Sequence, residues 1–234
     1  MLSPTTLRWL AVAGIAAPVG FVASALTQSL LRADHALLTD PISALAAGPD
    51  GWIQNVTFAA AGVLLVAFAA GLHGAVRPSR AGALGPVLVA LFGVGLLGAA
   101  AFPAADAASV FVEDQVPVSH VVAGVVAFLS VGPAALLLSW RLSRDSEWRD
   151  LAGYVRAVSV TLLVLFLAGG VLVRPAGAPF HDWLGVFQWV YAVVVWYPCV
   201  VVLAVRLLRV ARELPRPGLG GGAAVVPGEQ RASQ

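Results

Sequence analysis

Six apolar runs, each about twenty residues long, constrain this chain more than any other feature of its sequence. An α-helix rises about 1.5 Å per residue, so roughly twenty residues cross the hydrocarbon core of a bilayer. No run carries an acidic residue away from its ends. The pattern predicts an all-α, polytopic membrane bundle of six transmembrane helices. The expected spans are Leu10–Leu31, Val56–Val76, Gly82–Phe102, Val118–Trp140, Ala152–Val173 and Trp183–Leu208.

The composition supports a membrane protein and argues against other classes. Hydrophobic residues make up 59% of the chain and charged residues only 11%, whereas a soluble domain carries about 25% charged residues. The formal net charge is only +2, so we expect membrane lipid and no nucleic acid as a partner. Cys199 is the only cysteine, which excludes an intramolecular disulfide. The oligomeric state does not follow from these patterns.

The arginines are distributed unequally between the two ends of the predicted bundle. The chain has 14 basic residues, all of them arginine, and only Arg32 and Arg174 fall at the end that holds the first, third and fifth loops. Cytoplasmic loops of membrane proteins carry the excess of basic residues, so both termini are predicted to be cytoplasmic. The richness in Ala, Val, Leu, Gly and Arg is typical of a GC-rich bacterial genome. We therefore expect a multi-pass protein of the bacterial cytoplasmic (inner) membrane.

The two ends of the chain invite separate interpretations. Residues 1–212 are predicted to form the six-span transmembrane domain. Residues 213–234 are rich in Pro, Gly and Ala and end in polar residues, which predicts a disordered cytoplasmic tail. Ala23-Ser24-Ala25 also matches a signal-peptide cleavage pattern, and cleavage near residue 25 would leave five spans. The apolar run continues to Leu31, which favours an intact first span.

Several polar side chains fall at the arginine-poor end of the predicted bundle. In the first loop, Asp40 followed by Pro41 is typical of a helix N-cap and first turn, and Gly48 fits the end of that short helix. Asp106 follows the third span and His120 begins the fourth, so these antiparallel neighbours can bring both side chains to one region. The complete set of candidate residues is His35, Asp40, Ser43, Asp106, His120, His181, Asp182 and Gln188.

Three kinds of chemistry fit this set of side chains. The first is a polar cluster that holds the loops together. The second is a ligand pocket, for which the candidates are His35, Asp40, Ser43, Asp182 and Gln188. The third is a catalytic site, for which the candidates are Asp106, His120 and His181, with a Ser43–His–Asp hydrolase arrangement as a variant. Imidazole and carboxylate groups are credible zinc ligands, but no ligand pair has a diagnostic spacing. No cofactor is predicted, and zinc remains an alternative.

A resemblance to a known family rests on short motifs of the same region. These motifs are Asp40–Leu45, Gly51-Trp52, Phe102-Pro103 with Asp106 close behind, and His120 at the start of the fourth span. Over residues 10 to 210 the chain resembles the bacterial membrane family labelled domain of unknown function 998. The resemblance implies a six-span inner-membrane protein and supplies no activity. The chain departs from the family pattern at two points: members often have a charged pair early in the last span, where this chain has Gln188-Trp189, and here an extra alanine separates Pro103 from Asp106.

Two functions are therefore compatible with the sequence. The first is an integral membrane protein that binds a small amphiphile or lipid in an outward-facing polar pocket. The alternative is a membrane-embedded enzyme, metal-dependent or not, that acts on a lipid or isoprenoid substrate. A charged relay through the middle of a span is absent from the sequence, which argues against an ion-driven pump.

Overall fold

The computed structural model describes residues 2–76, 80–103, 117–173 and 179–214, with residues 80–82 and 181 described by their backbone alone. Within these residues six helices are long and apolar enough to cross a membrane, which confirms the predicted six-span, all-α fold. The predicted tail, residues 213–234, lies almost entirely outside the described residues. The spans are α1 (Pro4–Leu31), α2 (Gly51–Ala75), α3 (Arg80–Ala101), α4 (Val118–Leu142), α5 (Ala152–Leu172) and a composite last span (Leu184–Glu213).

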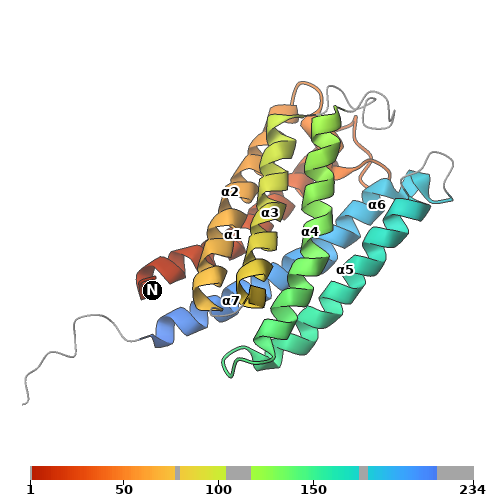
Figure 1. Cartoon of the computed structure of the whole chain (residues 1–234). Helices are drawn as coiled ribbons and strands as arrows, with labels where there is room; N and C mark the ends of the chain where they lie inside the picture. Colours follow the sequence, from red (N-terminus) through yellow and green to blue (C-terminus); the bar gives the residue numbers. More distant parts are fainter. Residues whose placement is uncertain (1, 77–79, 104–116, 174–178, 215–234) are drawn as a thin grey trace, which may run out of the picture.

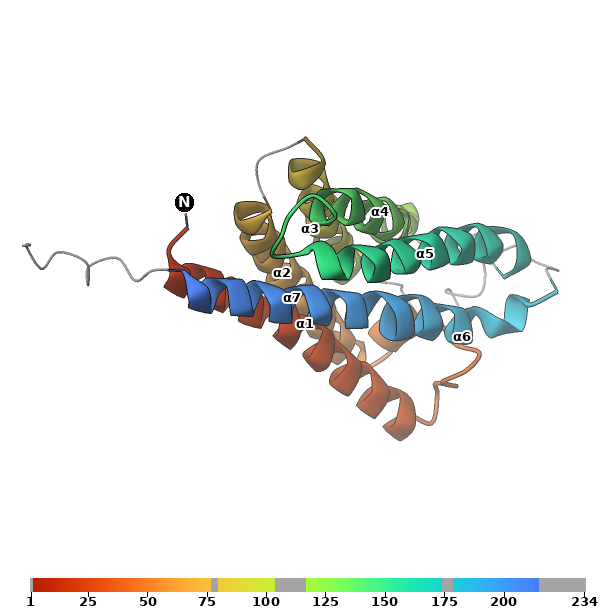
Figure 2. The same ribbon diagram turned by 90° about the horizontal axis from the view of Figure 1, so that it is seen from below.

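Each span packs against its neighbours in the chain, and these contacts form a ring. Figure 1 shows the spans together in one bundle. The ring closes because α1 also packs along α7 (Tyr197–Glu213), the final part of the last span. Figure 2 shows α1 and α7 side by side from below. We call the end where α1, α3 and α5 finish the arginine-poor end, and the opposite end the arginine-rich end.

Close backbone contacts between helices explain the many small residues in the spans. A Cβ atom added to Gly62 in α2 would lie 2.7 Å from the carbonyl oxygen of Gly93 in α3, and the reverse distance is also 2.7 Å. Helices in lipid gain little from hiding apolar surface, so they associate through such close packing. Outward-facing side chains are nevertheless apolar, as Val63 and Val164 show with exposed fractions of 58% and 59%. These faces suit contact with lipid tails.

A polar network ties α1 to α2 near the arginine-poor end. The Gln28 amide nitrogen donates to Gln54 Oε1 at 2.9 Å, and the hydroxyls of Ser24 and Thr57 lie 2.7 Å apart. Gln54 is fully buried. Hydrogen bonds of this kind hold transmembrane helices together where water cannot compete.

The last span is interrupted by a π-helical segment, whose turns are wider than those of an α-helix, and the apolar pattern of the sequence does not predict this segment. It begins with α6 (Leu184–Gln188), continues as a π-helical segment (Trp189–Trp196) and ends as α7. The amide of Tyr197 bonds the carbonyl of Ala192, five residues back. Pro198 follows at once, and a proline ring clashes with the carbonyl four residues before it in an α-helix. The wide turn relieves that clash, and such turns are frequent at functional sites.

The first loop differs from the helix expected there. The structure has a short 3-10 helix, η1 (Ile42–Ala46), preceded by Pro41, and Asp40 gives it no side-chain cap. The Asp40 carboxylate instead accepts hydrogen bonds from the Ala36 amide at 2.8 Å and the Thr39 hydroxyl at 3.0 Å. Asp40 therefore closes the preceding turn, and the N-cap prediction is wrong for that reason.

Candidate functional site

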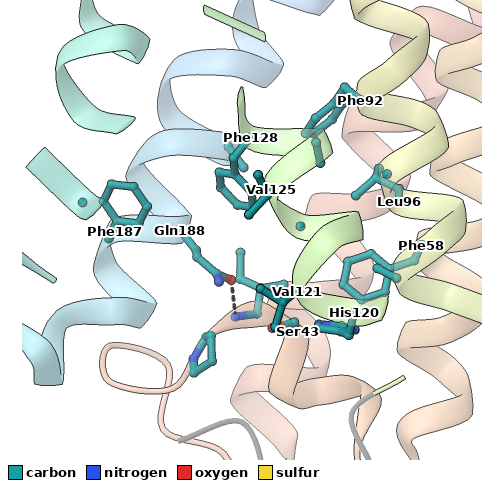
Figure 3. Close-up of a pocket in the computed structure, with 18 of the residues that line it drawn as sticks. Ser43, Phe58, Phe92, Leu96, His120, Val121, Val125, Phe128, Phe187 and Gln188 are labelled. Carbon is teal, nitrogen blue, oxygen red and sulfur yellow. Dashed lines mark hydrogen bonds between the residues drawn. The ribbon is translucent and has the colours of Figure 1, made fainter. Parts of the chain in front are cut away.

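A cavity of about 520 Å³ occupies the arginine-poor half of the ring. Its wall is mostly apolar, and each of the six spans contributes one phenylalanine to it. Tyr197 also lines the cavity, and its ring meets those of Phe21 and Phe92 edge to face. Figure 3 shows several of these side chains around the space. The six phenylalanines are Phe21, Phe58, Phe92, Phe128, Phe166 and Phe187.

Polar side chains meet the cavity where it approaches the arginine-poor end. Ser43 from η1, His120 from the first turn of α4 and Gln188 from the end of α6 all line it. In the view of Figure 3, Ser43 and His120 lie in the lower part of the cavity and Phe92 and Phe128 in the upper part. Three of the candidate residues from the sequence therefore share one cavity, although they come from separate parts of the chain.

The orientation of His120 is set by the end of α3. His120 is buried, and its Nδ1 lies 2.9 Å from the carbonyl oxygen of Phe102. A carbonyl oxygen only accepts, so Nδ1 carries the hydrogen and donates it. In the neutral ring Nε2 then holds the lone pair. Nε2 has no hydrogen-bond partner among the described residues, and its lone pair can accept a hydrogen bond.

Gln188 joins the last span to the first loop. Its Oε1 accepts from the Ile42 amide at 2.9 Å, as the dashed line in Figure 3 marks. In the part of the chain that the structure describes, its Nε2 has no partner and keeps both donor hydrogens. The side chain of Gln188 therefore bonds the backbone at the start of η1.

The same stretch of loop satisfies the free amides at the start of α6. The amides of Gly185 and Val186 donate to the carbonyls of Thr39 and Leu38 at 3.1 and 2.9 Å. A Cβ atom at residue 185 would lie 2.6 Å from the Asp40 carbonyl oxygen, so only glycine permits this approach. We call residues 38–43 the strap, because they lie across the end of the cavity and are hydrogen-bonded to α6.

Arg32 holds the first loop in place from the other side. Its two terminal nitrogens donate to the carbonyls of Leu45 at 2.7 Å and Ala47 at 3.0 Å, and the guanidinium also pairs with Asp34 at 2.7 Å. The hydrogen bond from Arg32 lowers the pKa of the Asp34 carboxyl. Arg32 thus has a structural role at an end of the bundle where arginine is otherwise scarce.

The other candidate residues lie apart from the cavity wall or outside the described part of the chain. His35 and Asp40 face each other within the first loop, with Nδ1 and Oδ2 3.8 Å apart, and burial lowers the pKa of His35. Asp182 is exposed before α6. Asp106 lies outside the described residues, and only the backbone of His181 is described.

The described residues bring no group of three His, Cys, Asp or Glu side chains close enough to hold a metal ion. Two of the three residues predicted for catalysis or metal binding, Asp106 and His181, have no described side chain and fall outside that search. The zinc alternative therefore stays a prediction.

The aromatic wall is the part of the site that sequence reasoning missed. Each phenylalanine sits in a run of apolar residues, and a helix that is apolar on all sides carries no signal for its inward face. The one available signal was the recurrence of a phenylalanine in every span.

The fold and the cavity together define a class of protein: a multi-pass, helical membrane protein with a largely apolar internal cavity. Comparison with known families places it more narrowly. The model of the family described as protein of unknown function (DUF998) matches residues 15–222, and the chain belongs to that family. No curated protein and no solved structure matches the chain.

Proposed function

We propose that this protein binds one small amphiphile or lipid in its cavity, in the cytoplasmic membrane of a bacterium and with the arginine-poor end facing outward. The observation that carries the proposal is the cavity itself, about 520 Å³ in volume and lined by all six spans. Ligand pockets for drug-sized molecules measure roughly 300–1,000 Å³. The distribution of arginine supports the orientation.

The distribution of polar groups favours a ligand with one polar and one apolar end. Ser43, His120 and Gln188 supply hydroxyl, imidazole and amide groups at one end of the cavity. Leu184 and Tyr197, which bracket the rest of α6 and the π-helical segment, both line the cavity. Aromatic rings line this stretch. A polar head placed against His120 would therefore leave an apolar chain among the phenylalanines.

Photolabelling tests the proposal directly. The purified protein is placed in phosphatidylcholine nanodiscs that contain palmitic acid with a diazirine in its chain, irradiated and mapped by peptide mass spectrometry. We expect adducts on cavity residues such as Phe92 and Phe128, and competition by unlabelled palmitic acid. Labelling spread evenly over lipid-facing residues, with no competition, would reject binding in the cavity.

Matched variants distinguish loss of labelling caused by a filled cavity from loss caused by misfolding. Ala99→Phe and Ala192→Phe place a ring in the wall from α3 and from the last span. Both should abolish competitive labelling. Ala60→Phe makes the same change on the exposed surface of α2 and should leave labelling unchanged. Size-exclusion chromatography shows which variants are folded.

A second candidate function, a membrane-embedded enzyme acting on a lipid or isoprenoid, is favoured by the geometry of His120. Its hydrogen bond to Phe102 leaves Nε2 able to accept a proton, as a general base must. Ser43 lines the same end of the cavity and would be the nucleophile of a hydrolase variant. Labelling of Ser43 by a lipid-like alkyl fluorophosphonate, lost in His120→Ala, would favour the enzyme. An unlabelled Ser43 would exclude that variant.

Metal analysis decides the zinc-dependent form of this second candidate. Zinc at one ion per chain in the purified protein, lost in His120→Ala, would support a zinc enzyme. Protein without zinc that still binds palmitic acid in the cavity would support the amphiphile-binding proposal alone.

A further inference from the structure

Helices α4 and α5 touch in one half of the bundle and separate in the other. The hydroxyl of Ser159 donates to the Gly132 carbonyl at 2.8 Å, and a Cβ atom at Gly132 would lie 2.8 Å from the Leu163 side chain. These contacts lie near the middle of both helices. They hold α4 and α5 in direct contact there.

Toward the arginine-poor end the two antiparallel helices no longer meet. Gly124 lies about two turns from Gly132 along α4, and Gly170 lies about two turns from Leu163 along α5, in the direction that keeps them level. A Cβ atom at either glycine would meet nothing within 4 Å. Figure 1 shows the same divergence of α4 from α5.

The gap between α4 and α5 leads into the cavity. Gly124, Val125 and Gly170 all line the cavity, and Val125 is 37% exposed. A residue that both lines a cavity and is exposed marks an opening. The surrounding surface is apolar, because Val122 and Leu167 are 54% and 69% exposed. The opening therefore faces the hydrocarbon of the bilayer rather than water.

The strap covers the cavity along the axis of the bundle. Pro41, Ile42 and Ser43 form part of the cavity wall at the arginine-poor end. The strap is bonded to α6 through the Gly185 and Val186 amides and through the Gln188 side chain. Entry along the axis would require these three hydrogen bonds to break, whereas entry between α4 and α5 requires no such change.

We infer that the cavity exchanges its ligand sideways with the bilayer, through the opening edged by Gly124, Val125 and Gly170, and that the ligand is a membrane lipid. The inference rests on the proposed function. A chain of the lipid enters between α4 and α5 and lies among the phenylalanines, and its polar head lies against His120 and Gln188. A second chain, where the lipid has one, stays outside in the bilayer.

A reversible bridge across the opening tests this route. The double variant Gly124→Cys with Gly170→Cys is joined, after folding, by a bis-methanethiosulfonate reagent, and dithiothreitol removes the bridge. The native Cys199 is fully buried and does not compete for the reagent. Diazirine palmitic acid in phosphatidylcholine nanodiscs is the probe. Bridging before the probe is added should abolish cavity labelling, reduction should restore it, and probe loaded before bridging should be retained.

A matched bridge at the strap serves as the control. Leu38→Cys with Val186→Cys ties the strap to α6, where the backbones are already hydrogen-bonded. Loading should be unchanged. A single substitution gives an independent measurement, because Gly170→Trp obstructs the opening and should slow loading without changing its end point. Gly153→Trp, on the same helix and also with open space at its Cβ, should load at the wild-type rate.

The outcomes separate the route from the proposed function. Loss of loading at the α4–α5 bridge together with normal loading at the strap bridge supports lateral entry. If the probe still labels the cavity when the opening is bridged, or loads at the wild-type rate in Gly170→Trp, the inference of lateral entry is overturned. The proposed binding of an amphiphile in the cavity would still stand. Absence of competitive cavity labelling in the unmodified protein rejects the proposed function itself.

Discussion

Two tyrosines of the last span should respond in opposite directions to the same substitution. The hydroxyl of Tyr191 donates to the Phe128 carbonyl at 2.6 Å, across the gap between the last span and α4. The hydroxyl of Tyr197 is buried and has no hydrogen-bond partner among the described residues. Both side chains are almost completely buried, with exposed fractions of 1% and 2%. Tyr→Phe removes only the hydroxyl in each case.

The expected free energies of unfolding follow from these contacts. Tyr191→Phe loses a hydrogen bond between helices, which costs about 0.6 kcal/mol on average in a membrane bundle and at most about 1.7 kcal/mol. Tyr197→Phe removes an unpaired hydroxyl from an apolar environment, where burying such a group costs about 1–3 kcal/mol by mutational data. The first variant should be less stable than the wild type, and the second more stable. Their difference should be about 2 kcal/mol.

Equilibrium unfolding measures this difference. Each variant is titrated from dodecyl maltoside into mixed micelles with sodium dodecyl sulfate, and helix content is followed by circular dichroism. Ala60→Phe, on the exposed surface of α2, controls for changes in detergent binding. Equal destabilisation by the two Tyr→Phe substitutions would refute the reasoning, because it would mean that the Tyr197 hydroxyl also makes a stabilising hydrogen bond.

Three further predictions concern the loops. Arg32→Ala should lower the free energy of unfolding by about 1–3 kcal/mol, because two loop carbonyls lose their donor. Asp34→Asn keeps those hydrogen bonds and should change the free energy of unfolding by less than about 1 kcal/mol in the same detergent titration. Burial lowers the pKa of His35 below 6.5, so the unfolded chain binds the proton more tightly than the folded chain. The melting temperature should therefore fall as the pH drops through and below about 6.5, and His35→Gln should weaken this pH dependence. Reporter fusions after Arg149 should report a cytoplasmic position and fusions at Asp50 an outer one, and the reverse pattern would contradict the orientation drawn from the arginines.

The spans were predictable because their composition leaves no other stable structure. In a bilayer every backbone polar group must be paired within the chain, so a long apolar run becomes a helix. α4 begins at Val118, as expected, since Pro117 precedes it. The wide turn before Pro198 was not predictable from apolar content, because it depends on how a proline is accommodated within a packed helix.

The face that each span turns inward could not be predicted from the sequence. Leu91 and Phe92 are neighbours of similar hydrophobicity, yet Leu91 is 37% exposed and Phe92 is 2% exposed. In water a polar stripe would distinguish the two faces, but in lipid both faces are apolar. The position of the cavity therefore emerges only from packing. His120 was within reach of prediction because a histidine at the start of an apolar span is conspicuous.

The wrong prediction of Asp40 as an N-cap in the first loop has a similar cause. Asp40 followed by Pro41 is a sound local signal for a helix start, but the carboxylate is already used by the amide of Ala36. Arg32 contributes as well, because it donates to the Leu45 and Ala47 carbonyls at the C-terminal end of the short helix. Local signals compete with such contacts, and the sequence alone does not show which of them prevails.

The contact between α1 and α7 has a consequence for the order of events during synthesis. The first span enters the membrane early, yet its partner in the ring belongs to the sixth span, which leaves the ribosome after the other five. Until then the cavity lacks the part of its wall that the last span supplies, from Leu184 to Tyr197. Insertion of the last span encloses the space, so under the proposed function a lipid can enter it while the ring is still open, before the opening between α4 and α5 is needed.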